Sequence, residues 1–437
     1  MSEDVHSGQD DAYHKIAAAP AAEPRGCPVD AEFTPFDANY LDDPYPQLAQ
    51  LMAEAPICYS AKLGYLVVTG MDNVVAVLRN HADFSSANVQ DPVLPVCTAA
   101  QAVMSTPDYN PQAVMSNCQQ PDHTRIRRFT QGAFNARRMR LLEPYIRQTT
   151  DELIDAMLAS QGAVDFVAQL AHPLPGRVIF RLIGFPPEDD AQLIDWTANR
   201  LMFTWGQPTP AAQTEIAGNM LSYWRYCRAF VASRLAAPGD DLTSELLAAH
   251  HDHPDLLSLR EVESIVYGLS FAGHEIVSNF LSLALKNLLD DRGIWQHLCA
   301  DQSLIANALE EVLRFDSPQT SWRRVATRDL TFKGVEVPKG TRVFLSLGAA
   351  NRDASAFDAA ENFDVTRGNA NKHVSFGHGI HFCLGARLAR LEAQIALETL
   401  CRRMPDLRIV PGQRLRYSPN MTFRGPTQLW VEWDAVR

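Results

Sequence analysis

The 437-residue chain lacks the features of several protein classes. Its most apolar runs, Ile265–Phe271 and Ile276–Leu285, are separated by His274 and Glu275, and each is too short to span a bilayer. The N-terminus is acidic and polar and has no apolar core of a secretory signal. Basic residues are scarce: 39 Lys and Arg against 51 Asp and Glu give a net charge of −12, which argues against nucleic acid as a partner. We therefore expect a cytoplasmic protein that binds neither membranes nor nucleic acid.

Several redox and metal motifs are also missing. None of the eight cysteines forms a C-x-x-C pair, and their spacing fits no structural zinc site. The chain has neither a G-x-G-x-x-G nucleotide fingerprint nor the C-x₄-C-x₂-C motif of a ferredoxin. A redox enzyme with this sequence would therefore need electrons from a separate partner.

The residues that are present predict a mainly helical fold. Residues 1–30 are rich in Ala, Pro, Asp and Glu, and we expect a disordered leader there, followed by one domain over residues 31–437. Asp43-Pro44-Tyr45 indicates entry into a first helix. Short strand signals, rich in branched residues or punctuated by Gly and Pro, lie at residues 63–69, 330–347 and 415–433. Most of the remainder has helical periodicity, so we expect helices with small β-sheets rather than a doubly wound α/β fold.

One predicted helix runs from about Ser258 to Leu289. It contains no proline and is apolar on nearly every face, as expected for a helix buried through the centre of its domain. Ala272-Gly273-His274-Glu275 interrupts the apolar surface at the midpoint. Small residues there let another group approach the backbone, and a carboxylate there is costly unless it is hydrogen-bonded or functional.

The sharpest chemical signal is the segment Phe376-Gly377-His378-Gly379-Ile380-His381-Phe382-Cys383-Leu384-Gly385. Its glycines permit a tight loop before the cysteine, and Gly385 leads into an amphipathic helix. Backbone N–H groups and the dipole at the start of such a helix favour a thiolate that can bind a metal. A lone cysteine is usually a buried structural residue, but the ten-residue pattern outweighs that interpretation.

This segment is similar to the haem-binding loop FGxGxHxCxG of the cytochrome P450 family at every defined position. The resemblance implies a single-domain P450 fold with a long central helix over the haem. It also implies haem b as the cofactor, with Cys383 as the thiolate ligand of the iron and Phe376, His381 and Gly385 in the haem site. Residues 201–206 and 421–426 are in addition similar to the haem domains of bacterial members that are fused to a reductase.

A second motif, Glu311-Val312-Leu313-Arg314, matches the family's ExxR. An i, i+3 pair can meet on one helix face, although an isolated ExxR is usually a solvated ion pair. The resemblance gives the pair a structural role near the proximal side of the haem. Its third member is either Arg352 or Arg367.

A third motif lies within Pro121-Asp122-His123-Thr124-Arg125-Ile126-Arg127-Arg128. The segment by itself indicates a basic helix face. The resemblance makes His123 and Arg127 donors to a haem propionate, a carboxylate that needs charge-assisted partners. Arg324 and His381 match further donors of the family, with a one-residue slip from Arg324 to Arg323 left open.

The central helix carries the family's oxygen-activation motif AGx(D/E)T in an altered form. Ala272, Gly273 and Glu275 match it, but Ile276 occupies the threonine position and can neither donate nor accept a hydrogen bond. The acid–alcohol pair that relays protons in the family is therefore broken. Protons could pass through Glu275 and water or a substrate hydroxyl. The enzyme could also couple poorly, use peroxide directly or run another reaction, and Ile276 could be an engineered change.

The resemblance implies a monooxygenase that inserts one oxygen atom from O₂ into a small hydrophobic, on one interpretation aromatic, substrate. Electrons would come from a ferredoxin or flavodoxin, or from a reductase domain absent from this chain. Arginines on either side of the motifs could steer an acidic donor or form a solvated helix face; they are Arg125, Arg127, Arg128, Arg137, Arg138, Arg140, Arg387 and Arg390.

Family topology places the substrate pocket at Phe203, Trp205, Thr320, Trp322, Thr422 and Phe423, and the same topology includes the loop around residues 90–118. Both tryptophans could equally be core residues. Two other functions stay open: a peroxide-using or atypical haem-thiolate enzyme, and a haem sensor without turnover. A sensor would have little need of a buried acid at Glu275.

Overall fold

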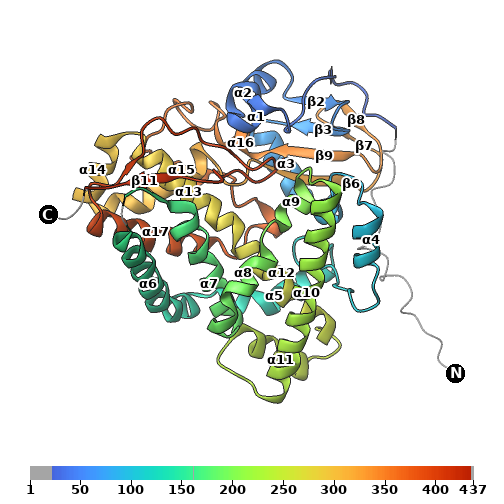
Figure 1. The fold of residues 1–437 in the computed structure, drawn as a ribbon. Helices are drawn as coiled ribbons and strands as arrows, with labels where there is room; N and C mark the ends of the chain where they lie inside the picture. Colours follow the sequence, from blue (N-terminus) through green and yellow to red (C-terminus); the bar gives the residue numbers. More distant parts are fainter. Residues whose placement is uncertain (1–21, 161, 435–437) are drawn as a thin grey trace.

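Short strands from both halves of the chain form a six-stranded sheet in the order β1-β2-β3-β9-β6-β4. The structure, a computed structural model, describes residues 22–160 and 162–434 (Figure 1). The strands of this sheet are β1 Val29–Asp30, β2 Ile57–Ser60, β3 Tyr65–Val68, β4 Phe84–Ser85, β6 Ser321–Ala326 and β9 Arg342–Ser346. Two smaller sheets are β10-β11-β5 (Arg408–Ile409, Trp430–Glu432, Val164–Asp165) and β7-β8 (Leu330–Phe332, Val335–Val337).

Helices make up most of the remaining chain and cover the side of the molecule away from the large sheet (Figure 1). Their bounds are α1 Ala38–Asp42, α2 Tyr45–Glu54, α3 Met71–Arg79, α4 Thr98–Met104, α5 Asp122–Gln131, α6 Ala136–Ala159, α7 Pro173–Ile183, α8 Asp190–Thr197, α9 Arg200–Trp205, α10 Pro210–Ala236, α11 Leu242–Asp252, α12 Leu259–Gly273, α13 Glu275–Leu289, α14 Arg292–Ala300, α15 Ile305–Phe315, α16 Leu347–Asn351 and α17 Ala386–Arg403. The prediction of a mainly helical domain with small sheets is confirmed.

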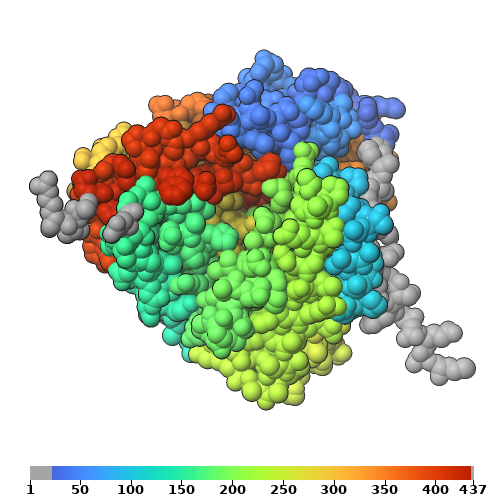
Figure 2. Space-filling view, in the orientation of Figure 1, coloured from blue at the N-terminus to red at the C-terminus, as the bar shows by residue number. Residues whose placement is uncertain are grey.

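The large hydrophobic core lies among the helices, and two smaller clusters lie against the large sheet. The helical core is built around α7, α10, α12, α13 and α17, whose apolar faces pack together. In the space-filling view, the sheet region (blue), the C-terminal segment (red) and the helices coloured green meet on one face (Figure 2). This arrangement brings residues far apart in sequence to the centre of the molecule.

The leader boundary predicted at residue 30 is wrong for residues 22–30. Val29 and Asp30 form β1 and pair in parallel with β2, and Tyr59 N–H donates to the carbonyl of Pro28 at 2.9 Å. Arg25 pairs with Glu336 through two backbone hydrogen bonds. Composition does not reveal such pairing, because a sheet edge offers main-chain groups to almost any extended segment. Residues 1–21 of the predicted leader lie outside the described residues.

The long helix predicted over residues 258–289 is divided into α12 and α13 at His274. That residue has φ −103° and ψ −81°, outside helical values. Its ring is fully buried, with Nδ1 3.1 Å from Thr197 Oγ1 and Nε2 3.0 Å from the carbonyl oxygen of His172. Gly273, directly before the break, contributes little helical preference. Periodicity alone could not show the break, because both halves remain largely buried.

Candidate functional site

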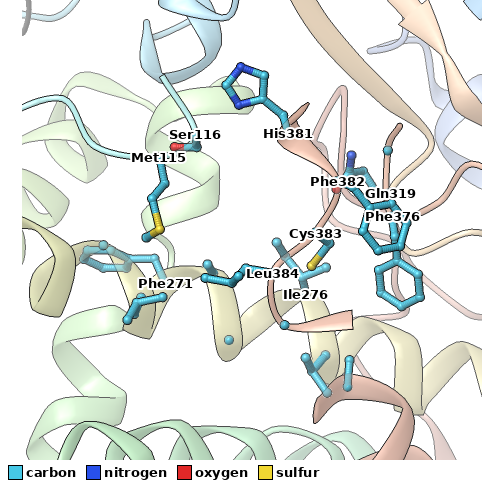
Figure 3. A pocket seen from close by; sticks show the side chains of 18 of the residues that line it. Met115, Ser116, Phe271, Ile276, Gln319, Phe376, His381, Phe382, Cys383 and Leu384 are labelled. Carbon is cyan, nitrogen blue, oxygen red and sulfur yellow. The ribbon is translucent and has the colours of Figure 1, made fainter. Parts of the chain in front are cut away.

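A cavity lies between the α12–α13 junction and the loop that precedes α17. Ala272, Gly273 and Ile276 line it from one side, and Cys383 lines it from the other. Figure 3 shows the Cys383 thiol and the Ile276 side chain pointing into this space. Most of the lining is apolar, so the cavity suits a large hydrophobic group with a few polar contacts.

The loop before Cys383 has the tight geometry that its glycines predict. Gly377 and Gly379 have φ values of +72° and +73°, which favour glycine, and a Cβ on Gly379 would lie 2.9 Å from the carbonyl oxygen of Leu78. The Cys383 N–H donates to the carbonyl of Phe376 at 2.9 Å and closes the loop. The backbone therefore holds the thiol in one place.

Opposing effects act on the Cys383 thiol. Burial raises its pKa, whereas hydrogen bonds from the backbone N–H groups of Gly385 and Ala386 and the charge of Arg127 lower it. Gly385 is the N-cap of α17, so these N–H groups belong to the positive end of a helix. Burial is the larger effect, so the pKa of the Cys383 thiol is raised overall, and the N–H groups and Arg127 offset part of this rise.

The predicted pair Glu311 and Arg314 lies fully buried beneath the cavity. Arg314 Nη2 and Nε donate to the Glu311 carboxylate, both at 2.7 Å. The Arg314 guanidinium also donates to the carbonyls of Asn351, Ala360 and Asn362. The pair therefore anchors the segment that follows α16, and it is not a solvated ion pair.

Of the two arginines considered as the third member, Arg367 contacts the pair and Arg352 does not. Arg367 Nε lies 3.1 Å from Glu311 Oε2. Arg352 donates to the carbonyl of Phe315 at 2.8 Å and stacks over the rings of Tyr45 and Phe315. The prediction for Arg352 is corrected: its guanidinium contacts Phe315, Tyr45 and Glu361 instead.

Nitrogen-bearing side chains gather at one end of the cavity. Arg127, Arg324 and His381 line it, and the His123 ring lies 4.2 Å from the His381 ring between centroids. Both ring nitrogens of His123 are buried and have no hydrogen-bond partner in the described chain. Burial lowers the pKa of His123 to about 4 and that of Arg324 to about 10. Such a group of donors fits an anionic carboxylate, as a haem propionate would provide.

The side chains of Arg323 and Arg324 have different surroundings. Arg323 donates to the carbonyls of Val89 and Asp91 at 2.6 and 2.8 Å and lies over the Trp205 ring. Arg324 Nη1 donates to the carbonyl of Arg323 at 2.8 Å, and its side chain reaches the cavity. The one-residue slip is therefore excluded, because alternate residues of β6 face opposite sides of the sheet.

Glu275 contacts α9 and is absent from the described lining of the cavity. Its Oε1 accepts from the Asn199 N–H at 3.1 Å, and its Oε2 accepts from the Leu201 N–H at 3.2 Å. Burial raises the pKa of Glu275 to about 7, while these two hydrogen bonds and the charge of Arg200 lower it. The acid predicted to face the oxygen site is therefore engaged at the start of a neighbouring helix.

Gly273 permits a close approach, but to another helix. A Cβ on this residue would lie 2.7 Å from Ile179 Cγ1 on α7. Ile276 lines the cavity and packs against the apolar cluster that includes Trp322. The altered motif thus presents small and apolar groups to the cavity, and its two polar residues, His274 and Glu275, bond to surrounding elements.

Three of the six residues predicted for the substrate pocket line the cavity: Trp205, Trp322 and Phe423. The Trp205 ring centroid is 6.1 Å from that of Trp322 and 4.9 Å from that of Phe423. Both tryptophans also pack in one apolar cluster, so each contributes to the core and to the cavity wall.

The other three predictions, Phe203, Thr320 and Thr422, are corrected. Phe203 is 3% exposed and packs in the helical core, because it points away from the cavity on α9. The Thr320 N–H donates to the carbonyl of Thr422 at 2.8 Å, and both side chains are buried in this pairing. Family topology located the right segments but could not tell which alternate residue faces inward.

Sequence reasoning missed a polar group in the wall of the cavity. Arg200, Gln90 and Ser116 all line it. Gln90 and Ser116 belong to the loop around residues 90–118, which was expected there, whereas Arg200 was not named. The signal for Arg200 was present, because it is a lone cation in the largely apolar segment that becomes α9. No group of three or more His, Cys, Asp or Glu side chains in the described chain is arranged to hold a metal ion.

Known proteins share this fold and much of this sequence. The cytochrome P450 family model matches residues 212–405. Cytochrome P450 107B1 of Saccharopolyspora erythraea is 39% identical over 332 residues, which are 76% of this chain and 79% of that protein. The chain belongs to the cytochrome P450 family. As a P450 it is a haem-thiolate monooxygenase.

Solved P450 structures confirm the fold. Cytochrome P450 CREJ, in complex with (4-ethylphenyl) dihydrogen phosphate, has a TM-score of 0.88 and 36% identity, covering 92% of this P450 and 99% of that chain. An intact type IV self-sufficient cytochrome P450 monooxygenase has a TM-score of 0.91 and 35% identity over 96% of this P450. The matched region is 55% of that longer chain. Among the described residues of this P450, no helix is long and apolar enough to cross a membrane.

Proposed function

We propose that Cys383 binds the haem iron in this cavity and that the enzyme inserts one atom of O₂ into a hydrophobic substrate. The observation that carries the proposal is the placement of the Cys383 thiol, which is held by the glycine loop and points into a cavity between two helices. When bound, the haem supplies the oxidising chemistry, and a thiolate ligand favours cleavage of the O–O bond. The protein orients the substrate and limits access of water.

The haem carboxylates would bind at the end of the cavity where His123, Arg127, Arg324 and His381 gather. The unpartnered nitrogens of His123 and the buried charge of Arg324 both favour an anionic partner there. Phe376 lines the cavity next to Cys383, so its ring would pack against the proximal side of the haem. Glu311, Arg314 and Arg367 would support this side through the buried ion pairs beneath it.

Proton delivery in this P450 would not use a side-chain hydroxyl at position 276. Ile276 provides none, and both oxygens of Glu275 accept hydrogen bonds from α9. We infer that water within the cavity carries the protons and that Glu275 acts chiefly as a positioning residue for α9. The second candidate is an enzyme of this fold that takes its oxygen from peroxide, which would not depend on a hydroxyl at position 276.

The substrate would be hydrophobic and aromatic. Trp205, Trp322 and Phe423 form an aromatic wall of the cavity, and such walls favour stacking with aromatic ligands. The bound compound of the neighbour CREJ is itself an aromatic molecule, which supports this choice.

Electrons would come from a separate ferredoxin or flavodoxin. Arg128, Arg137, Arg140 and Arg387 are exposed, and no described acidic side chain forms an ion pair with any of them. An acidic donor would be attracted to such a surface. The self-sufficient relative suggests the alternative of a reductase on the same polypeptide. We place the protein in the cytoplasm, where its eight free cysteines would stay reduced.

The carbon monoxide complex of the reduced protein tests the haem ligand. We expect the red-shifted Soret band of thiolate ligation in the wild type and its loss in Cys383→Ser. A matched substitution of another buried cysteine, Cys227→Ser, should keep the band. A shorter-wavelength band in intact wild-type protein would overturn the proposal.

Reconstitution separates the candidate reactions. Product formed with NAD(P)H, a ferredoxin reductase and a ferredoxin, faster than with hydrogen peroxide, supports the O₂-dependent monooxygenase. Faster product formation with peroxide alone supports the second candidate. No product under either condition, with substrate-dependent spectral changes retained, would support a sensor.

A further inference from the structure

Arg200 is a buried cation in the wall of the cavity. It is 7% exposed, begins α9 and lines the same space as Cys383 and Ile276. No carboxylate among residues 22–160 and 162–434 lies within ion-pair distance of its guanidinium. A buried charge without a counterion is costly, and such groups are usually paired or functional.

The hydrogen bonds of Arg200 leave one of its three nitrogen atoms without a partner. Nη1 donates to Thr204 Oγ1, and Nη2 donates to Gln90 Oε1 at 3.3 Å. Nε is buried and has no partner in the described chain. The guanidinium also lies 5.6 Å from the centroid of the Phe271 ring, a contact that orients the charge without neutralising it. Two neutral acceptors and an aromatic ring therefore hold the side chain, and the acid nearest in effect, Glu275, forms no ion pair with it.

Glu275 positions Arg200 without pairing with it. Its two oxygens accept from the backbone N–H groups of Asn199 and Leu201, the residues on either side of Arg200. Neither oxygen is within ion-pair distance of the guanidinium, although the charge of Arg200 lowers the pKa of this carboxyl. The acid of α13 thus fixes the backbone of the first turn of α9, and the Arg200 side chain extends from this fixed turn.

Gln90 contacts Arg200 and links it to further polar groups in the cavity wall. Gln90 Nε2 donates to Ser116 Oγ at 3.3 Å, so the Ser116 hydroxyl proton is available for a further acceptor. Gln90, Ser116 and Asn117 all line the cavity with Arg200. In Figure 3, Ser116 lies on the same side of the cavity as His381 and away from Phe376 and Phe382. We call Arg200, Gln90, Ser116 and Asn117 the polar corner.

The other two arginines in the cavity wall, Arg127 and Arg324, have other contacts. Arg127 Nη2 donates to the carbonyl of Phe382 at 2.5 Å, and Arg324 belongs to the donor group around His381. These two residues serve the haem carboxylates in the proposed function. Arg200 is therefore the cation in the described lining that is left for the substrate.

We propose that the polar corner binds an anionic group of the substrate, a carboxylate or a phosphate monoester, while the aromatic wall of Trp205, Trp322 and Phe423 holds its hydrophobic part. The proposal rests on the proposed function, since it assigns the substrate class of the same cavity. The guanidinium lines the cavity and keeps N–H groups without acceptors in the described chain, and the Ser116 hydroxyl, linked to it through Gln90, adds a donor for either anion. The enzyme would thus select amphiphilic aromatic anions over neutral analogues of the same shape.

Spectral titration of the haem-loaded enzyme tests this selection. The probes are 4-propylbenzoate, 4-propylphenyl phosphate and the neutral methyl 4-propylbenzoate, each followed by the low-spin to high-spin Soret shift. We expect at least one anion to bind about tenfold or more tighter than the ester, as the charge-assisted contact implies. Arg200→Gln should remove this preference and leave the affinity for the ester within about twofold. The two anions distinguish a carboxylate site from a phosphate site.

Two further variants serve as controls for the effect of Arg200→Gln. Arg200→Lys retains the charge and should keep part of the preference. Arg225→Gln removes an exposed arginine of α10, whose side chain is 56% exposed, and should change nothing. Equal binding of anions and ester by the wild type would overturn the proposal. So would an equal loss for all three probes in Arg200→Gln, which would make Arg200 a purely structural residue.

Two measurements distinguish an error in the polar corner from an error in the proposed function. Quenching of tryptophan fluorescence reports the same affinities independently of the haem ligand, because Trp205 and Trp322 line the cavity. An anion preference with no thiolate Soret band would overturn the proposed function alone. A thiolate band with no anion preference would overturn the polar corner alone.

Discussion

Glu275 Oε2 accepts a hydrogen bond from the backbone N–H of Leu201 at 3.2 Å. The same carboxyl accepts from Asn199, so it joins the start of α13 to the start of α9. The N–H groups of a first helical turn lack partners within the helix, and an acid there satisfies them and complements the helix dipole. The acid of the altered oxygen-activation motif therefore shapes the wall of the cavity.

The ionisation of Glu275 should make stability depend on pH. Its pKa is about 7 in the folded protein, raised by burial from the ordinary value of 4.5. The folded state therefore binds an extra proton between these values, so the stabilising contribution is complete below about pH 4.5 and is lost as pH rises through 7. The free energy of unfolding of the wild type, relative to Glu275→Gln, should fall between pH 5 and pH 8. Urea unfolding at both pH values measures it.

The matched control for this prediction is Glu152→Gln, which changes an exposed glutamate of α6. Its difference from the wild type should not vary with pH over the same interval. Parallel pH profiles for the wild type and Glu275→Gln would show that the Glu275 carboxyl does not titrate in this range.

Loss of the buried Glu311 carboxylate should destabilise the protein strongly. Glu311→Ala leaves the guanidinium groups of Arg314 and Arg367 without their common partner. Breaking one partner of a buried ion pair costs about 3–5 kcal/mol. Glu143→Ala removes one of the two acidic partners of Arg147 at the surface, which should cost about 0–1 kcal/mol. Chemical denaturation of both variants gives the comparison, and similar losses would contradict the structural role of Glu311.

Gly379→Ala should damage the loop that holds Cys383. A methyl group there would lie 2.9 Å from the carbonyl oxygen of Leu78, in a backbone conformation with φ +73°. Gly64→Ala shares the φ value of +73° but meets open space, so it carries only the conformational cost of about 1–2 kcal/mol. We expect Gly379→Ala to lower the fraction of protein with the thiolate Soret band well below that of Gly64→Ala. Equal fractions would show that the contact with Leu78 is relieved at little cost.

Ile276→Thr should improve the use of electrons for product. The new hydroxyl would lie in the cavity wall and could hold a water molecule near the oxygen site. We expect peroxide released per NAD(P)H consumed to fall by about twofold or more in a reconstituted system. Ile276→Val has a similar shape without the hydroxyl and should leave peroxide release unchanged. An equal effect of Val and Thr would point to the size of the side chain as the cause.

Local chemistry predicted the proximal half of the site. The glycines at 377 and 379 have the positive φ values expected of a tight loop, and Gly385 caps the helix that follows. Glu311 and Arg314 stand three residues apart, so one helical turn brings them together wherever that helix lies. Each of these relationships involves residues a few positions apart, so the sequence alone was enough to predict it.

Tertiary structure decided the relationships between distant segments. The choice of Arg367 over Arg352 depends on a contact with Glu311 across 56 residues, and the bond from Glu275 to Leu201 spans 74. Arg324 faces the cavity because β6 pairs with β9 in one register, which turns Arg323 to the opposite side. Helical periodicity and composition describe each segment alone, whereas these contacts require the packing of two segments. The polar corner belongs to this second kind, since Arg200 and Gln90 meet across 110 residues.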